Sequence, residues 1–452
     1  MDFQIKLFII ILISLLSFSC GQKENKTIAH ITDSQVNISY QKCMSDTSQS
    51  YWIAVPPLRD SLRALPLIIA FDPHGDGKLA VSSLTGASAD FGYMVAGSNI
   101  IRNGYERMEE AFSVMRNDIL NRYNVDKERI YAAGFSGGGR FAQIFSQMYP
   151  DVKAVISIGA GSVFNPSAKP LNKLPVLFLA GNEDFNYMEI NSSAKNLESM
   201  GFRYYIYEFK GRHEWPDRQI MDEAVLWFEF DDCRRNKNRK DDPLIKNWLA
   251  IVKDRADSLI ADQEIIQACQ EYEKGIAFLS GLVNIKSISK EIESLKGTRA
   301  YNDQLSKKQY AQNLEIRLQQ GYIRAFNQKD TAWWGKEIRN LNREINQGKD
   351  TYLLSAYKRI KSFLSMASYS FCNESVKAND LMRAARLIEI YRTIDPANPD
   401  VNYFSALYYS RSGQPEKAKE YFRRAIAAGF KDFKKASDEL TGEIYSAGLS
   451  AK

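Results

Sequence analysis

The chain has 452 residues, enough for two or three domains, each with a hydrophobic core of its own. Hydrophobic residues make up 44% of it and charged residues 25%, as in ordinary globular proteins. Its 60 basic and 54 acidic residues give a formal net charge of +6, too small at this length for a dedicated nucleic-acid-binding protein. We therefore expect no nucleic-acid partner.

The N-terminus has the pattern of a secretion signal. Lys6 precedes the apolar run LFIIILISLLSF, which is shorter than the roughly 20 residues that span a bilayer. The run ends at Cys20 in LSFSCG, which resembles a bacterial lipoprotein signal. That resemblance implies a signal peptide over 1–19, lipid on Cys20 and a tether over 20–32. The protein would then be anchored to a bacterial membrane in the cell envelope, outside the cytoplasm. An uncleaved N-terminal anchor is the alternative.

Residues 33–232 show strands that alternate with helices. The first two strands, VNISYQ and SYWIAVP, are separated by the polar DTSQS, which predicts a hairpin. Compact apolar runs predict further strands at LPLIIAF, around Ile130, and at VKAVISIG, LPVLFLAG and YYIYEF. Helical periodicity lies between them, at 106–123, 137–149, 189–200 and 217–229. The fold class predicted is α/β, with a mostly parallel sheet and helices on both faces.

The composition changes at 233–243. The stretch RRNKNRKDD has no apolar residue and predicts a charged linker, either solvated or a patch for anionic lipid or polysaccharide. Asp242 and Pro243 then predict a helix N-cap and a first-turn proline. No convincing strand follows, so residues 244–375 are predicted to form helices only. Trp333 and Trp334 within it are either a binding surface or core residues of one helix.

Residues 376–452 have an internal period. Small and aromatic residues recur 34 positions apart, where Ala384, Ile388 and Tyr391 are matched by Ala418, Phe422 and Ala425. Together with Ala406, Tyr409 and Gly413 this pattern resembles the tetratricopeptide repeat. The resemblance implies helix hairpins that could bind a protein partner. The segment 244–375 fits it poorly and is either degenerate repeats or an unrelated bundle.

Four cysteines remain besides the one in the signal, and none belongs to a C-x-x-C pair or has a histidine nearby: Cys43, Cys233, Cys269 and Cys372. This spacing gives no support to a zinc site. Cys43 and Cys233 would join the two ends of the first domain as a disulfide in an oxidising compartment. The sequence leaves open whether they pair.

The stretch GFSGGGR, residues 134–140, contains G-x-S-x-G between a predicted strand and a predicted helix. In that context the serine lies on a sharp turn whose backbone angle requires small neighbours, the nucleophile elbow. A glycine-rich loop is the alternative. The sequence makes Ser136 the candidate nucleophile.

A serine nucleophile needs a base and an acid, and the chain has three histidines. His30 lies in the tether, and His74 follows the strand LPLIIAF. His213 lies after the last strand and before the last helix, so it is the candidate base. The candidate acid is Asp184, after LPVLFLAG, with Glu183 as a competing carboxylate. The order nucleophile, acid, base is that of α/β hydrolases.

The segments YNVDKERIYAAGFSGGGRFA, AGNED and GRHEWP resemble extracellular α/β-hydrolase esterases, closest to the polyhydroxybutyrate-depolymerase and feruloyl-esterase-like group. The resemblance covers roughly 33–232. It implies hydrolysis of carboxylic esters, with no metal or organic cofactor. It also implies an oxyanion hole from the backbone N–H of Gly137 and a second N–H from Gly75 or Asp76. The extra acidic residues of DPHGDG depart from the group and leave this second donor open.

Two other functions remain open: a serine peptidase of the same fold, and a non-catalytic lipoprotein that binds a partner through its helices. Every triad candidate precedes residue 232, which predicts that the helical region is dispensable for the chemistry. Asp184 lies only 48 positions after Ser136, which leaves too few residues for a large lid domain at that point. We therefore expect an open cleft, which suits a bulky or polymeric substrate, unless the later helices fold over it.

Overall fold

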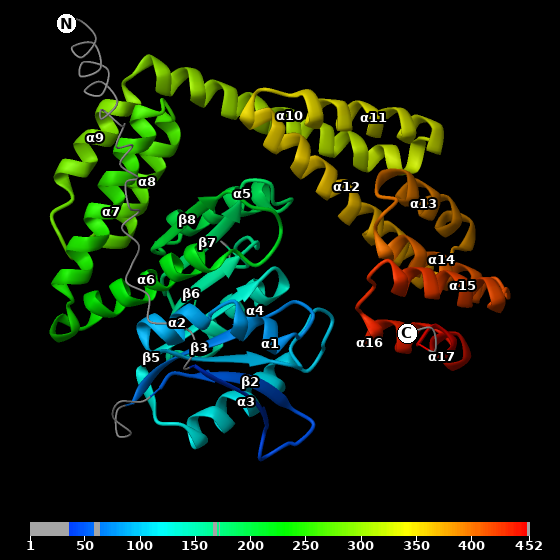
Figure 1. Ribbon diagram of the computed structural model, residues 1–452, viewed down its shortest axis with the longest axis horizontal. Coiled ribbons are helices and arrows are strands. Elements are labelled where there is room, and N and C mark those ends of the chain that lie inside the picture. The colour runs from blue at the N-terminus through cyan, green and yellow to red at the C-terminus, as the bar shows by residue number, and fades with distance from the viewer. Residues whose placement is uncertain (1–35, 58–63, 166–169, 171, 450–452) are drawn as a thin grey trace, which may run out of the picture. The chain divides into compact units, whose positions relative to one another are not determined.

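The computed structural model describes residues 36–57, 64–165, 170 and 172–449 (Figure 1). The predicted signal peptide, the tether, Cys20 and His30 lie outside the described residues. Among the residues described, no helix has both the length and the apolar character needed to cross a membrane.

The first half of the chain forms one mixed sheet of eight strands in the order β1-β2-β4-β3-β5-β6-β7-β8. The strands are β1 (Asn37–Lys42), β2 (Ser50–Val55), β3 (Leu65–Phe71), β4 (Met94–Ser98), β5 (Val125–Phe135), β6 (Val152–Ile158), β7 (Val176–Gly181) and β8 (Tyr204–Phe209). The predicted hairpin is confirmed: β1 and β2 pair antiparallel. β2 also pairs antiparallel with β4, and the remaining pairs are parallel. Strand β4 was not predicted, because Met-Val-Ala-Gly-Ser has little β-branched character.

Six helices belong to this α/β part: α1 (Gly77–Ser82), α2 (Thr85–Phe91), α3 (Met108–Arg122), α4 (Gly137–Met148), α5 (Tyr187–Ser199) and α6 (Arg218–Arg235). The four longer helices lie where the sequence predicts them, and the short α1 and α2 were not predicted. Both faces of the sheet are covered. On one face Phe71 packs against Phe112 of α3 and Phe145 of α4. Tyr131 of β5 points to the opposite face and stacks on Phe228 of α6 at 4.3 Å.

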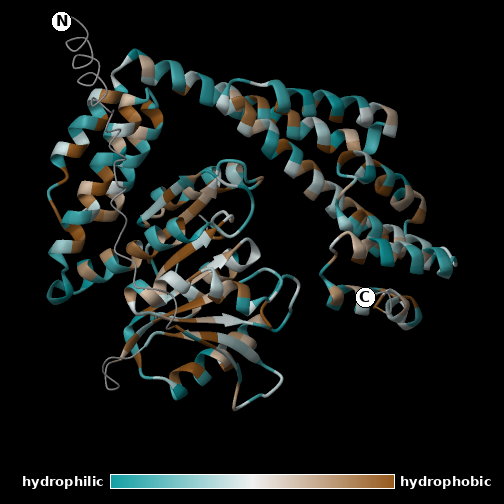
Figure 2. Ribbon diagram, viewed as in Figure 1, coloured by the Kyte–Doolittle hydropathy of each residue, from teal (hydrophilic) through white to brown (hydrophobic). Residues whose placement is uncertain are grey.

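The second half is helical: α7 (Asp242–Ala261), α8 (Ile265–Leu279), α9 (Lys286–Lys296), α10 (Arg299–Gln328), α11 (Thr331–Gln347), α12 (Thr351–Lys377), α13 (Leu381–Ile394), α14 (Pro399–Arg411), α15 (Pro415–Ala427), α16 (Phe433–Glu439) and α17 (Gly442–Leu449). The described residues after 235 contain no named strand, as predicted. In Figure 2 hydrophilic and hydrophobic residues alternate along these helices, which is typical of helices that bury one face. We call α7–α17 the helical region.

The tryptophan pair belongs to the core of the helical region. Trp334 is fully buried and its ring lies 4.8 Å from that of Phe326, whereas Trp333 is partly buried. The first helices of the region pack on the α/β part. Phe278 of α8 is fully buried, with its ring 5.3 Å from Trp227 of α6 and 5.7 Å from Trp248 of α7.

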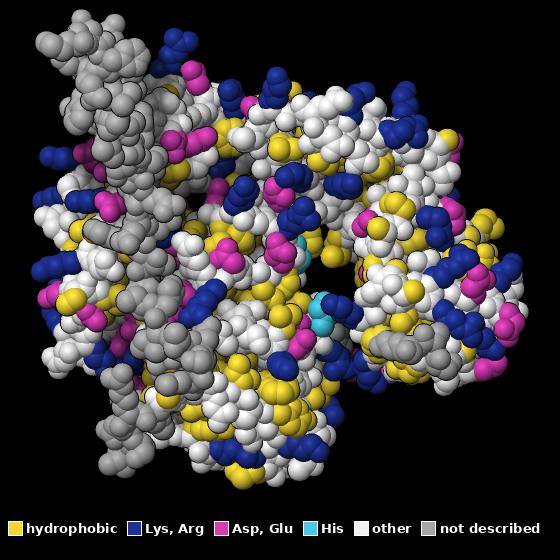
Figure 3. All heavy atoms as spheres, in the orientation of Figure 1, with side chains coloured by type: hydrophobic (Ala, Val, Ile, Leu, Met, Phe, Trp, Pro, Cys, Tyr) yellow, Lys and Arg dark blue, Asp and Glu magenta, His cyan; other side chains and the backbone are white. Residues whose placement is uncertain are grey.

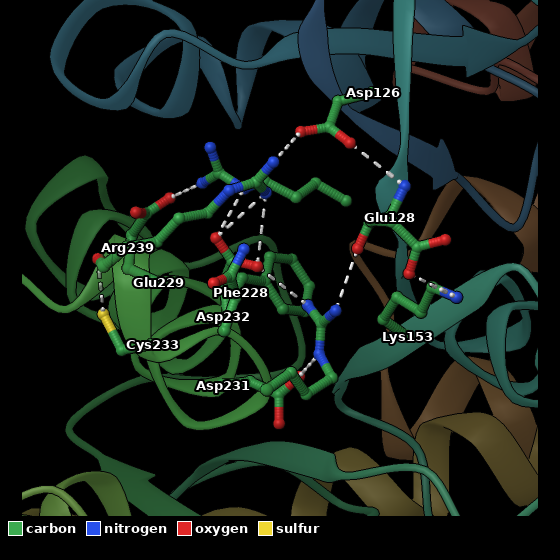
Figure 4. A network of polar contacts seen from close by, with 12 residues as sticks. Asp126, Glu128, Lys153, Phe228, Glu229, Asp231, Asp232, Cys233 and Arg239 are labelled. Carbon is green, nitrogen blue, oxygen red and sulfur yellow. Dashed lines mark hydrogen bonds and ion pairs between the residues drawn. The ribbon is translucent and has the colours of Figure 1, made fainter.

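The charged stretch between the two halves is largely exposed, as expected of a solvated linker, but its arginines are paired within the protein and do not form a free basic patch. Helix α6 continues to Arg235, and Arg239 pairs with Asp126 at 2.9 Å and with buried Asp232 at 3.4 Å (Figure 4). Arg234 donates to backbone carbonyls at the end of α8. These arginines are held by carboxylates and carbonyls, so the segment ties the helical region to the α/β part.

Two further expectations change. Asp241, not Asp242, caps α7 by accepting from the N–H of Leu244, while Pro243 lies in the first turn as predicted. The disulfide is absent: Cys43 and Cys233 are both free and buried, and the Cys233 thiol contacts the carbonyl of Arg239 at 3.4 Å.

Candidate active site

Ser136 lies between the end of β5 and the start of α4, at a backbone φ of 53° and ψ of −121°. A positive φ is strained for a residue with a side chain, and such strain persists only where the surroundings enforce it. Here the Ser136 N–H donates to the carbonyl of Ile158 at 2.7 Å, and the Ser136 carbonyl accepts from the N–H of Gly139 at 3.0 Å. The strand, turn and helix of the predicted elbow are therefore present.

The glycines around Ser136 are required by close backbone contacts. A Cβ on Gly138 would lie 2.1 Å from the carbonyl oxygen of Phe71 in β3, and one on Gly134 would lie 2.3 Å from the backbone of Gly138. A Cβ on Gly137 would meet only a side chain, the Oδ1 of Asn103, at 1.9 Å. The glycines thus let the turn and the first residues of α4 press against the central strands.

The structure brings Ser136, His213 and Asp184 together from three loops. The His213 Nε2 lies 3.0 Å from the Ser136 Oγ, and its Nδ1 lies 2.9 and 3.0 Å from the two carboxylate oxygens of Asp184. Asp184 is only 1% exposed. The competing carboxylate, Glu183, points elsewhere and pairs with Lys358 at 2.6 Å.

Three residues that the sequence analysis missed hold the imidazole in place. The ring lies between Phe135 and Phe185, with centroids 4.6 and 4.2 Å away. Gly159, at a φ of 61°, leaves room for the His213–Asp184 contact. A Cβ at this position would lie 2.9 Å from the Asp184 Oδ2 and 3.1 Å from the His213 Nδ1. The only sequence feature that could have indicated this close packing is the glycine directly after the strand VKAVISI.

The loop after β3 is organised by a buried carboxylate. Asp72 accepts from the N–H of His74 at 2.9 Å and from the Trp215 indole at 3.0 Å, which links this loop to the one that carries His213. The carbonyl of Asp72 accepts from the N–H of Gly75 at 3.0 Å. The second oxyanion donor stays a prediction, but this engaged N–H favours Asp76 over Gly75.

His213 opens into a cavity of about 840 Å³ that both halves of the chain line. His74, Asn103 and Phe185 come from the α/β part, and the helical region contributes residues of α11–α14 and α16, such as Lys361 and Tyr369. Figure 3 shows a hollow at this place, with basic and acidic side chains around it. Of the two possibilities that the sequence left open, the structure shows the second: the helical region lies over the cleft. Residues of amphipathic helices carry no signature that predicts which of them will face a distant site.

The cavity wall formed by the helical region is polar and charged. Burial raises the pKa of Asp400 to about 6, an effect that Lys435 opposes and Asp432 reinforces. The Lys435 ammonium lies 5.2 Å from the ring centroid of Tyr369 and donates to its hydroxyl at 3.1 Å. Aromatic surface and fixed charge thus face the imidazole from across the cavity.

No protein-family model matches the sequence, and no curated protein does either. Solved structures similar to it include the fluorophosphonate-binding serine hydrolase F of Staphylococcus aureus, 11% identical, with a TM-score of 0.36 over 43% of this chain and 98% of that one. The S-formylglutathione hydrolase of the same organism is 13% identical, with a TM-score of 0.37 over 43% and 95%. The acylaminoacyl peptidase of Pyrococcus horikoshii is 16% identical, with a TM-score of 0.33 over 44% and 41%. At these values the similarities do not identify an activity for this chain.

Proposed function

We propose that the chain is a serine hydrolase of the α/β-hydrolase fold that cleaves carboxylic esters through an acyl-enzyme intermediate. The observation that carries the proposal is the geometry of one site. A serine at positive φ on a strand-to-helix turn lies 3.0 Å from an imidazole nitrogen, and the other nitrogen of that ring contacts a buried carboxylate. A mere glycine-rich loop would need neither the strain nor the two aligned partners.

In the acylation step the Ser136 hydroxyl passes its proton to the His213 Nε2 as its Oγ attacks the ester carbonyl carbon. Asp184 holds the ring with Nδ1 protonated and stabilises the imidazolium that forms. The carbonyl oxygen becomes an oxyanion facing the N–H of Gly137 and a second donor, Asp76 or Gly75. Each such donor typically contributes about 3–4 kcal/mol.

Collapse of the tetrahedral intermediate breaks the bond to the leaving alkoxide, which takes the proton from the imidazolium and departs as an alcohol. Water then gives a proton to His213 and attacks the acyl carbon. The second collapse releases the carboxylic acid and returns the proton to the Ser136 Oγ. No other reactant is needed.

The test has two arms on the full-length protein. A fluorophosphonate probe should label the wild type and not Ser136→Ala, and p-nitrophenyl butyrate should be hydrolysed. Ser136→Ala and His213→Ala should each lower turnover by about 10⁴–10⁶-fold, with the double variant little worse. Asp184→Asn should cost about 10²–10⁴-fold because it favours the wrong tautomer. Glu183→Gln is the control and should stay nearly neutral.

The outcomes separate the alternatives. Cleavage of a chromogenic peptide in preference to the ester would make the protein a serine peptidase. A folded protein that neither labels nor cleaves either substrate would make it a partner-binding protein. Near-normal turnover in His213→Ala would overturn the triad, because among the described residues His213 is the histidine that contacts both Ser136 and Asp184.

We also propose that the enzyme is lipid-anchored through Cys20 in the cell envelope. Support comes from the apolar run and the LSFSCG sequence alone. Cys20→Ala should leave the precursor unprocessed or release the protein from membranes, as mass spectrometry and fractionation would report. Unchanged mass and membrane attachment would indicate an ordinary N-terminal anchor.

A further inference from the structure

The loop that carries Asp184 is held from two sides. We call residues 182–184, between β7 and α5, the acid loop. Its backbone donors stay within the α/β part: the N–H of Asn182 donates to Phe209 at 2.8 Å and that of Glu183 to Gly211 at 2.9 Å. The carbonyl of Asn182 instead accepts from the helical region, where the Nη1 of Arg359 on α12 donates to it at 2.5 Å.

Arg359 contacts the chain on both sides of Asp184. Besides its bond to Asn182, its guanidinium lies 4.4 Å from the ring centroid of Tyr187, the first residue of α5. The N–H of Tyr187 donates to the carbonyl of Asp184 at 2.9 Å. The guanidinium thus reaches the residue two positions before the acid and the residue three positions after it.

The position of Arg359 is itself fixed. Its Nε lies 3.0 and 3.1 Å from the two carboxylate oxygens of Glu315 on α10. Arg359 is 4% exposed and Glu315 is fully buried. Burial raises the pKa of Glu315 even though Arg359 lowers it, so the pair does not fully offset the cost of burying the carboxylate. Buried pairs of this kind add little stability and are better explained by the geometry that they impose.

We propose that Arg359, held by Glu315, is a positioning residue that sets Asp184 against His213, so that the helical region acts in catalysis through the acid loop. This inference rests on the proposed function. Arg359 does not line the cavity, so it acts through Asp184 and not on substrate. The neighbouring Lys358 pairs with Glu183 of the same loop at 2.6 Å, but this pair is more exposed than that of Arg359 with Glu315 and should contribute little.

The test is designed to keep the fold intact. Arg359→Met alone would leave the Glu315 carboxylate buried without its partner, which risks misfolding. The double variant Arg359→Met/Glu315→Leu removes both charges and keeps apolar volume, so its unfolding temperature should stay close to that of the wild type. Its kcat on p-nitrophenyl butyrate should fall by about 10–100-fold, less than the loss expected for Asp184→Asn. KM should change by less than about threefold, since substrate contacts are untouched.

Two further readouts distinguish positioning from a general loss of structure. If Arg359 acts through Asp184, then Arg359→Met/Glu315→Leu should cost little more in an Asp184→Asn background, because coupled residues are not additive. The low-field proton resonance expected of the His213 Nδ1–H bound to Asp184 should also broaden or move upfield in the double variant. Additive losses with an unchanged resonance would overturn the proposal.

Tyr205→Phe is the matched control. The Tyr205 hydroxyl of β8 also joins the α/β part to the helical region, where it donates to the carbonyl of Gln270 on α8 at 2.9 Å, away from the acid loop. We expect its kcat to remain within about twofold of the wild type. An equal loss in Tyr205→Phe would refute a specific role for Arg359. If the wild type itself resists fluorophosphonate, the proposed function fails; if it labels and the Arg359 variants turn over normally, only this inference fails.

Discussion

The contact between Gly138 and β3 leads to a sharp prediction about the elbow. A Cβ added to Gly138 would lie 2.1 Å from the Phe71 carbonyl oxygen and 2.6 Å from its carbonyl carbon. Both are backbone atoms of a central, fully buried strand, so no side chain can rotate away. The start of α4, and Ser136 with it, must instead move by about 1 Å, and a displacement of that size in a catalytic constellation can cost about 10²-fold.

We therefore expect Gly138→Ala to lower kcat/KM on an activated ester by about 10²-fold or more. Its free energy of unfolding should fall by about 1–3 kcal/mol, as for other overpacked interiors. Initial rates with p-nitrophenyl butyrate and urea denaturation would measure the two effects. The variant should still fold, and its loss of activity should appear as slower labelling of Ser136 by the fluorophosphonate probe.

Gly321→Ala supplies the matched control, because Gly321 lies inside α10 and a Cβ there would meet nothing within 4 Å. It should leave activity unchanged and stabilise the protein by about 0.5–1 kcal/mol, since glycine is a poor helix former. Near-normal turnover of Gly138→Ala would show that the elbow is not held against β3.

Three other predictions concern the rest of the chain. Phe278→Ala should lower the free energy of unfolding by about 3–5 kcal/mol in urea titrations, because it leaves a cavity at a fully buried site between two tryptophans. A loss below about 1 kcal/mol would contradict that packing. The Asp400 carboxylate, with a folded-state pKa of about 6 against an ordinary 3.8, costs stability above about pH 6, and this cost disappears as the pH falls toward about 4. Asp400→Asn should therefore raise the unfolding temperature near pH 8 and not near pH 4, and an equal effect at both would refute the assignment. Burial raises the pKa of Cys43 and of Cys269 to about 11, so neither thiol should react with iodoacetamide near pH 8 until the protein unfolds, as mass spectrometry would show.

The sequence predicted best where local chemistry leaves a local pattern. Long apolar strands, such as that around Ile130, were found because they are buried in a continuous run, and the longer helices were found because their apolar residues recur at helical spacing. The elbow at Ser136 was found because a strained turn needs glycines beside it. Strand β4 was missed because small residues that pack closely have no strand signature: Gly97 lies in that strand, and a Cβ on it would be 2.2 Å from the carbonyl of Gly77.

Of the candidate site, only the proposed reacting groups were predictable. His213 and Asp184 could be assigned from their order along the chain, since the fold fixes which strand ends meet. Phe185 and Gly159 act through shape, and shape becomes visible only once loops converge. The ion pairs of the charged stretch were not predicted, because composition cannot reveal partners distant in sequence, such as Asp126 for Arg239.

The two kinds of contact between the halves of the chain have different physical consequences. The contact at α8 is apolar, because Phe278 is buried between aromatic rings, and such contacts contribute mainly to stability. The contact at α12 is a buried arginine with a carboxylate and a carbonyl, which adds little stability but demands one geometry. A chain that needed its helices only as a partner-binding arm could be joined by the first contact alone. The second lies beside Asp184, where, in the proposed mechanism, a geometric constraint would affect turnover. Damage at Phe278 should therefore lower unfolding temperature before activity, and damage at Arg359 with Glu315 should do the reverse.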